Sequence, residues 1–259
     1  MISILKFSLY GVLPGIAAYL ILSRTAREKT QLHEMATWSV LSHPIVGLMI
    51  FAGLALGFSI DSVASSMQVV GLVSLGLVGF TLARSRPPAV SWQFLLGLVG
   101  VLAVFIPMLS DRNLFAFHGF WHAAIANTVL AGQFPPENPG LAGNTISYVW
   151  FYHVWLAGMS KATGFHIAQV NVFGHIQLVA AMLGLTFVMA EKWGYSRRAA
   201  HAAFWLLFGS INVGALIHFA PYVAYWLIKP GGFFQAFSDH LNAVTLPLIS
   251  LTGTFLKVP

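Results

Sequence analysis

The 259 residues are 58% hydrophobic and 8% charged, with a mean hydropathy of +0.78 and a formal net charge of +6. Soluble domains hold about 25% charged residues, so the composition excludes a water-soluble globular fold. The cations are scattered beside apolar runs, which argues against a nucleic-acid partner, and the lack of cysteine excludes disulfides and thiol chemistry. The composition therefore predicts an all-α integral membrane protein.

Apolar runs of near-spanning length follow one another along the chain. Because about 20 helical residues cross a bilayer, they predict a polytopic bundle of about six or seven transmembrane helices. The runs are Ile4–Leu22, Trp38–Ile60, Val69–Ala83, Phe94–Leu109, Ile167–Ala190, Ala199–Phe219 and Leu241–Leu256. We treat residues 1–259 as one transmembrane domain. Since the last run reaches the end of the chain, we expect an N-terminal fragment of a longer protein or a shortened relative without activity.

The positive charges predict the orientation of the bundle. Nine of the 13 Lys and Arg residues fall on one side of the predicted spans, and Lys6, Arg112, Lys161 and Lys229 fall on the other. The nine are Arg24, Arg27, Lys29, Arg84, Arg86, Lys192, Arg197, Arg198 and Lys257. Cytoplasmic loops carry an excess of Lys and Arg, so these nine mark the inside. The N-terminus and the long Ser110–Ile146 loop are then outside.

Residues 110–164 concentrate polar side chains, which a membrane protein uses sparingly because their desolvation is unfavourable. Asp111 and Arg112 stand where the fourth apolar run ends, and Glu137 follows further along. The whole chain has only seven acidic residues, so two in one non-spanning stretch are informative. If the protein does chemistry or binds a polar ligand, we expect it to do so in this stretch.

Two helices and a stiff loop are predicted within this stretch. Asn113–Ala131 mixes apolar residues with His118 and His122, which share one helix face because they are four residues apart. The sequence FPPENPGLAGNTISY follows, and its prolines and glycines predict an ordered loop. Ser147–Thr163 is predicted to be an interfacial or shallow re-entrant helix, because a span at this place would turn the basic loop 192–198 outward.

The second helix carries aromatic residues suited to the headgroup region, namely Tyr148, Trp150, Tyr152 and Trp155. A short true span is the alternative for this helix. We expect the two helices and the proline loop to enclose a groove beside Asp111 that opens to both water and lipid.

The order of these features resembles the GT-C-type multi-spanning membrane glycosyltransferases. An acid just after a transmembrane helix precedes an interfacial helix with histidines, then PPENPGLAG, YVWFYH and a helix ending in Thr-Gly. The likeness covers about Ser110–Lys192. Members of that superfamily usually transfer a sugar from a polyprenyl-phosphate carrier to an acceptor at the outer face, and Asp111 matches the position of their essential outer acid. The resemblance implies membrane lipid and a polyprenyl-phosphate-linked sugar donor as partners, in a bacterial or archaeal plasma membrane.

Glycosyl transfer needs a base for the acceptor and stabilisation of the charge on the leaving phosphate. We take Asp111 and Glu137 as the candidate catalytic carboxylates. The candidate substrate-binding residues are Arg112, His118, His122, Tyr148, His153 and Lys161. No metal site is assigned, but a divalent metal ion on some of these oxygen and nitrogen ligands is kept as an alternative.

The same residues also have structural explanations: Asp111 beside Arg112 suits a solvated helix end, and Lys161 can reach headgroups. A transporter or channel is the alternative function, indicated by ionisable residues in mid-span. His43 near the end of its run and Asp61 in a predicted loop argue against it, whereas the polar residues after position 167 leave it open. A structural membrane subunit without catalysis is the third class.

Overall fold

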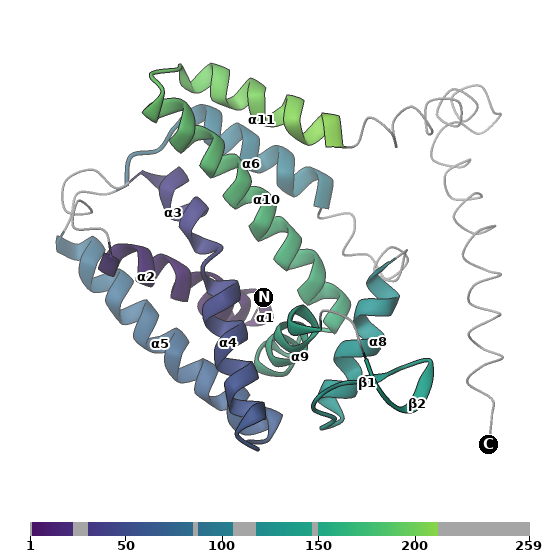
Figure 1. The fold of residues 1–259 in the computed structure, drawn as a ribbon. Helices are drawn as coiled ribbons and strands as arrows, with labels where there is room; N and C mark the ends of the chain where they lie inside the picture. Colours follow the sequence, from purple (N-terminus) through teal and green to yellow (C-terminus); the bar gives the residue numbers. More distant parts are fainter. Residues whose placement is uncertain (1, 23–30, 85–87, 106–117, 147–149, 212–259) are drawn as a thin grey trace, which may run out of the picture. The chain divides into compact units, whose positions relative to one another are not determined.

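The computed structural model describes residues 2–22, 31–84, 88–105, 118–146 and 150–211, and these are mostly helical (Figure 1). The chain divides into two units, Met1–Phe204 and Trp205–Pro259. The second unit is described only over the last residues of one helix. The packing described below is that of the first unit.

Four helical segments are long and apolar enough to cross a membrane. Ile2–Leu22 consists of α1 (Ile2–Phe7), the π-helical turn η1 (Ser8–Val12) and α2 (Leu13–Leu22), and Leu32–Ala55 consists of α3 (Leu32–Ser39) and α4 (Ser42–Ala55). The other two are α5 (Ile60–Arg84) and α10 (Ile167–Lys192). Two shorter helices, α6 (Trp92–Phe105) and α11 (Arg197–Ile211), match further predicted runs over their described parts. The run Leu241–Leu256 lies outside the described residues.

Two of the four spans begin earlier than the hydropathy predicts, because polar caps start them. The second span begins at Leu32 rather than Trp38, since the side chain of Glu34 accepts from the Gln31 N–H and completes a capping box. The third begins at Ile60 rather than Val69, after Ser59 caps its first turn. Asp61, which we expected in a loop, therefore lies in the first turn of α5.

Contacts at the helix ends show which of the turns and loops between helices lie close together, and they form two groups. At one end, Leu32 N–H donates to the Ala89 carbonyl at 3.1 Å, and His33 lies 3.2 Å from Glu191. At the other end, Lys161 pairs with Asp61 at 2.7 Å. The first group contains the edges of the basic loops predicted to be inside, and the second contains elements predicted to be outside. The contacts fix which ends lie together, and the absolute orientation stays a prediction.

The first two spans are each interrupted where they meet. The Gly15 N–H bonds to Ser42 Oγ at 2.7 Å instead of continuing the α-helical pattern, and the same hydroxyl donates to the Val12 carbonyl at 2.8 Å. Gln177 of α10 donates to the carbonyls of Gly11 and Ser39, both at 2.8 Å. Side chains thus satisfy backbone groups with which the lipid chains of a membrane cannot form hydrogen bonds.

Candidate functional site

The first helix of the candidate site, α8 (His118–Leu130), occupies most of the predicted Asn113–Ala131. It buries Ala123, Ile125, Ala126 and Val129 and leaves Trp121 exposed. Gly132 follows with a φ of 90°, and its N–H donates to the Val129 carbonyl at 3.0 Å. Gly132 therefore ends the helix, since a left-handed conformation just after the last turn is a position that glycine adopts readily.

The proline-rich segment after α8 forms a short antiparallel hairpin of β1 (Glu137–Asn138) and β2 (Leu141–Thr145). Its turn is closed by the Asn138 side chain, which accepts from the Gly140 N–H at 2.9 Å. Glu137 pairs with Thr145 across the hairpin and is half-buried. The segment is ordered as predicted, but its strands are too short for the sequence pattern to predict them.

The second helix, α9 (Phe151–Thr163), is the most buried of the described helices and packs against α1, α4, α5, α8 and α10 (Figure 1). Trp155, which we expected among lipid headgroups, is only 1% exposed. Its ring stacks on His43 at 4.4 Å and on Tyr152 at 5.6 Å. The expectation was wrong for Trp155 because hydropathy does not distinguish an aromatic belt from an aromatic core.

Two predicted substrate-binding residues meet between α8 and α9. His122 Nδ1 lies 2.8 Å from His153 Nε2, and the edge of the Tyr152 ring faces the His122 ring at 5.8 Å. His153 is 1% exposed, whereas His122 is half-buried. Burial, reinforced by the charge of His122, lowers the pKa of His153 to about 4. At neutral pH His153 is therefore an uncharged hydrogen-bonding partner that can hold the more accessible His122 in place.

Tyr152 continues this polar cluster toward α10. Its hydroxyl donates to the side-chain oxygen of Asn171 at 2.7 Å. Burial raises the pKa of the Tyr152 phenol, so the hydroxyl stays protonated and acts as a donor. We name His122, Tyr152, His153 and Asn171 the histidine–tyrosine cluster. It can position a polar group and exchange a proton, but it has no carboxylate of its own.

Lys161, another predicted substrate-binding residue, forms an ion pair with Asp61 at 2.7 Å. Lys161 is 41% exposed and Asp61 is 70% exposed, so solvent screens the pair and either charge can interact with a ligand. Asp61 was expected in a loop and was not among the predicted site residues. The signal was present in Ser59 followed by Asp61, which is the pattern of a helix N-terminus.

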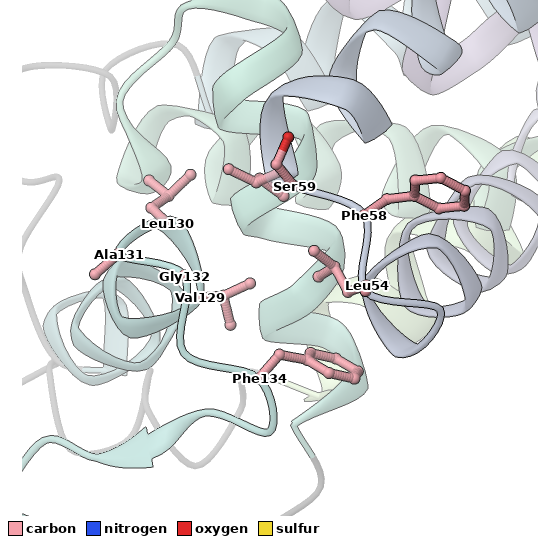
Figure 2. A pocket seen from close by; sticks show the side chains of 10 residues that line it. Leu54, Phe58, Ser59, Val129, Leu130, Ala131, Gly132 and Phe134 are labelled. Carbon is pink, nitrogen blue, oxygen red and sulfur yellow. The ribbon is translucent and has the colours of Figure 1, made fainter.

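A groove of about 510 Å³ lies between the turn that joins α4 to α5 and the C-terminal end of α8 (Figure 2). Leu54 and Val129 contribute apolar walls, and Ser59 is the polar side chain among its lining residues. Its lining residues are Leu54, Gly57, Phe58, Ser59, Ile60, Val129, Leu130, Ala131, Gly132 and Phe134. Ile60 lines the groove and Asp61, the partner of Lys161, is the next residue of the chain, but neither charged residue lines the groove.

The remaining predicted residues divide into two cases. Asp111, Arg112 and Tyr148 lie outside the described residues. The predicted groove beside Asp111 therefore stays a prediction. His118 opens α8, but its side chain is not among those described. Over the described ranges, no group of three or more His, Asp or Glu side chains could hold a metal ion.

Comparison with protein-family models, with curated proteins and with solved structures finds no match to this chain. The class of the protein therefore follows from its own features: a mostly helical chain with four helices long and apolar enough to cross a membrane. These are the features of a helical integral membrane protein.

Proposed function

We propose that this chain is an integral membrane glycosyltransferase of GT-C type that moves a sugar from a polyprenyl-phosphate carrier to an acceptor at the outer face. Its membrane is a bacterial or archaeal plasma membrane, with the N-terminus outside. One observation carries the proposal. The helices α8 and α9, with the hairpin between them, bring His122 Nδ1 within 2.8 Å of His153 Nε2. In this reading, α9 is a re-entrant helix.

The two halves of the donor suit two neighbouring features. An isoprenoid chain suits the apolar groove beside α8, and its phosphate suits Lys161 and Arg112 as cationic partners. His122, held by His153, suits a hydrogen bond to a sugar or acceptor hydroxyl. The base is then Asp111, with Glu137 as the second carboxylate. A divalent metal ion stays an alternative way to stabilise the phosphate.

The experiment is sugar transfer to the endogenous acceptor in membranes that lack the native gene product. Asp111→Asn keeps the size of the side chain but removes its charge, so we expect transfer to fall by about a hundredfold, the usual range for loss of a general base. Glu137→Gln should reduce transfer less, because water can partly replace a loop carboxylate. Protein abundance is checked by blot. Full transfer by Asp111→Asn at normal abundance would overturn the proposal.

A transporter or channel is the second candidate function. The observed span begins at Leu32 rather than at Trp38, so His43 lies near the middle of the span and not near its end. Together with His33, it places two histidines within the segment Leu32–Ala55. Substrate-dependent flux through vesicles containing the purified chain, without any sugar transfer, would favour this function over the first. A structural subunit would show neither activity.

A further inference from the structure

The interruptions of the first two spans face each other at a close approach of their backbones. A Cβ atom on Gly15 would lie 2.6 Å from the Ser39 carbonyl oxygen and 2.7 Å from the Ser42 nitrogen. Both interruptions therefore lie at the same level, inside the group of spanning helices. The backbone stays helical at both places, as a π-helical turn at Ser8–Val12 and a tight turn at Val40–Leu41, but its hydrogen-bond pattern changes there. Carbonyls that lose their partner in the helix must find another one inside a membrane.

Gln177 connects the two interruptions from α10. In a continuous α-helix, the backbone N–H of His43 would donate to the Ser39 carbonyl. Here that N–H donates to the Val40 carbonyl at 3.0 Å, and Gln177 Nε2 donates to the Ser39 carbonyl at 2.8 Å. The Gln177 amide therefore stands beside the first turn of α4, where His43 projects. Its two N–H groups are both used, by Ser39 and Gly11.

Several buried polar atoms of this region have no hydrogen-bond partner among the described residues. They are Gln177 Oε1, Trp155 Nε1 and the ring nitrogens of His43, a half-buried residue whose ring also has the Val40 carbonyl near it. Gln177 is 6% exposed and Trp155 is 1% exposed. His43 stacks on Trp155, and a Cβ atom on Gly174, one turn before Gln177, would lie 3.6 Å from His43 Nε2. The three side chains thus belong to one neighbourhood formed by α4, α9 and α10.

These atoms are chemically complementary to a molecule that both donates and accepts. Gln177 Oε1 accepts, Trp155 Nε1 donates, and a neutral imidazole supplies one donor and one acceptor. A buried polar group without a partner destabilises the fold, and a buried water usually makes about two to four hydrogen bonds to such groups. An apolar ligand would leave all of these groups unsatisfied.

We propose that His43, Trp155 and Gln177 form a buried binding site for water at the interruption of the first two spans. The bound water donates to Gln177 Oε1 and exchanges hydrogen bonds with His43 and Trp155. The site shares no residue with the histidine–tyrosine cluster or the groove, although Trp155 stacks on Tyr152 of that cluster, and it does not depend on sugar transfer. It gives Gln177 two roles, since one end of its amide holds the backbone carbonyls and the other holds the water.

Radiolytic hydroxyl-radical labelling of the full chain in nanodiscs, read by mass spectrometry, tests the site. Radicals form from water next to the side chain, so we expect Trp155 to be oxidised although it is buried. Met67 is the internal control, because it is 1% exposed, chemically reactive and on α5, a helix that contributes no residue to the proposed site. Trp155 labelling no higher than that of Met67 would overturn the proposal, whatever the variants do.

His43→Phe keeps an aromatic ring on Trp155 and removes both ring nitrogens. If water is bound, we expect Trp155 labelling to fall to the level of Met67 and the melting temperature to drop, because the water loses a partner. A dry site predicts the opposite, since removing unsatisfied nitrogens would raise the melting temperature. Unchanged Trp155 labelling in a folded His43→Phe protein would show that His43 holds no water and would also overturn the proposal.

Discussion

His153 shows how one buried residue makes stability depend on pH. Its pKa in the folded protein is about 4, below the ordinary value of 6.5, so folding favours its neutral form. Above pH 6.5 it is neutral in both states. As the pH falls from there, the unfolded chain takes up the proton first, and this stability is lost progressively until the pH has passed through about 4.

We therefore expect the melting temperature of the purified chain to fall between these two pH values, and His153→Phe to make that fall shallower. His175→Gln is the matched control for loss of a histidine, since His175 is exposed on α10. Thermal unfolding at a series of pH values measures both. An equally steep slope in His153→Phe would show that another group carries the effect.

Gly15 is required by the close approach of the first two spans. Gly15→Ala should lower the melting temperature clearly, because its Cβ would stand 2.6 Å from a backbone carbonyl oxygen that cannot turn away. Gly76→Ala on the exposed side of α5 is the control, since no atom lies within 4 Å of its Cβ position. Equal melting temperatures for the two variants would show that the spans separate easily at Gly15.

Single residues of the candidate site could be predicted by type but not by partner. His122, His153 and Lys161 were all selected from the loop sequence. The pair between His122 and His153 could not be predicted, because it depends on how α8 packs on α9, and 31 residues separate the two histidines. The partner of Lys161 could have been found, since Asp61 stands at a recognisable helix start.

The spanning elements were predictable because hydropathy over about 20 residues is a strong signal. Ile4–Leu22 and Ile167–Ala190 match the observed spans within two residues at each end. The interruptions at Ser8–Val12 and at Val40–Leu41 were not predictable, because the groups that satisfy them, Ser42 and Gln177, come from other helices. Apolar periodicity is insensitive to such tertiary hydrogen bonds.

The helix α9 differs from the spans in length and in the position of its ends. Its 13 residues extend about 20 Å, less than the hydrocarbon core of about 30 Å. Near its start, Trp150 stacks on Phe51 at 5.7 Å, and near its end Lys161 pairs with Asp61. Phe51 lies in the C-terminal half of α4 and Asp61 in the first turn of α5, so the two ends of α9 contact two helices that one turn joins.

A re-entrant α9 makes a direct prediction about sidedness. Asn138→Cys precedes the helix and His166→Cys follows it, and the chain has no cysteine of its own. We expect an impermeant maleimide to label both positions from the same side of sealed vesicles. Labelling from opposite sides would mean that α9 crosses the membrane, which is the alternative that the sequence left open.

At the scale of the whole molecule, the contacts between helix ends and the distribution of charge describe the same two-sided arrangement. The end that holds the His33–Glu191 contact also holds Arg197, which lies 3.0 Å from Glu191. The opposite end holds Lys161, whose charge is offset by Asp61. Charge alone gives the orientation, since packing within the chain is the same in either direction across the bilayer.

The last prediction is that orientation. The sequence predicts nine of the 13 Lys and Arg residues on the same side as the loop after α10, and loops rich in Lys and Arg stay in the cytoplasm. Tyr195→Cys, at an exposed position of that loop, should be labelled only after the membrane of intact cells is permeabilised, whereas Asn138→Cys should react from outside. The reverse pattern would place the histidine–tyrosine cluster and the groove on the cytoplasmic side. A donor presented at the outer face could not reach them there. The reverse pattern would therefore overturn the proposed transfer reaction together with the predicted orientation.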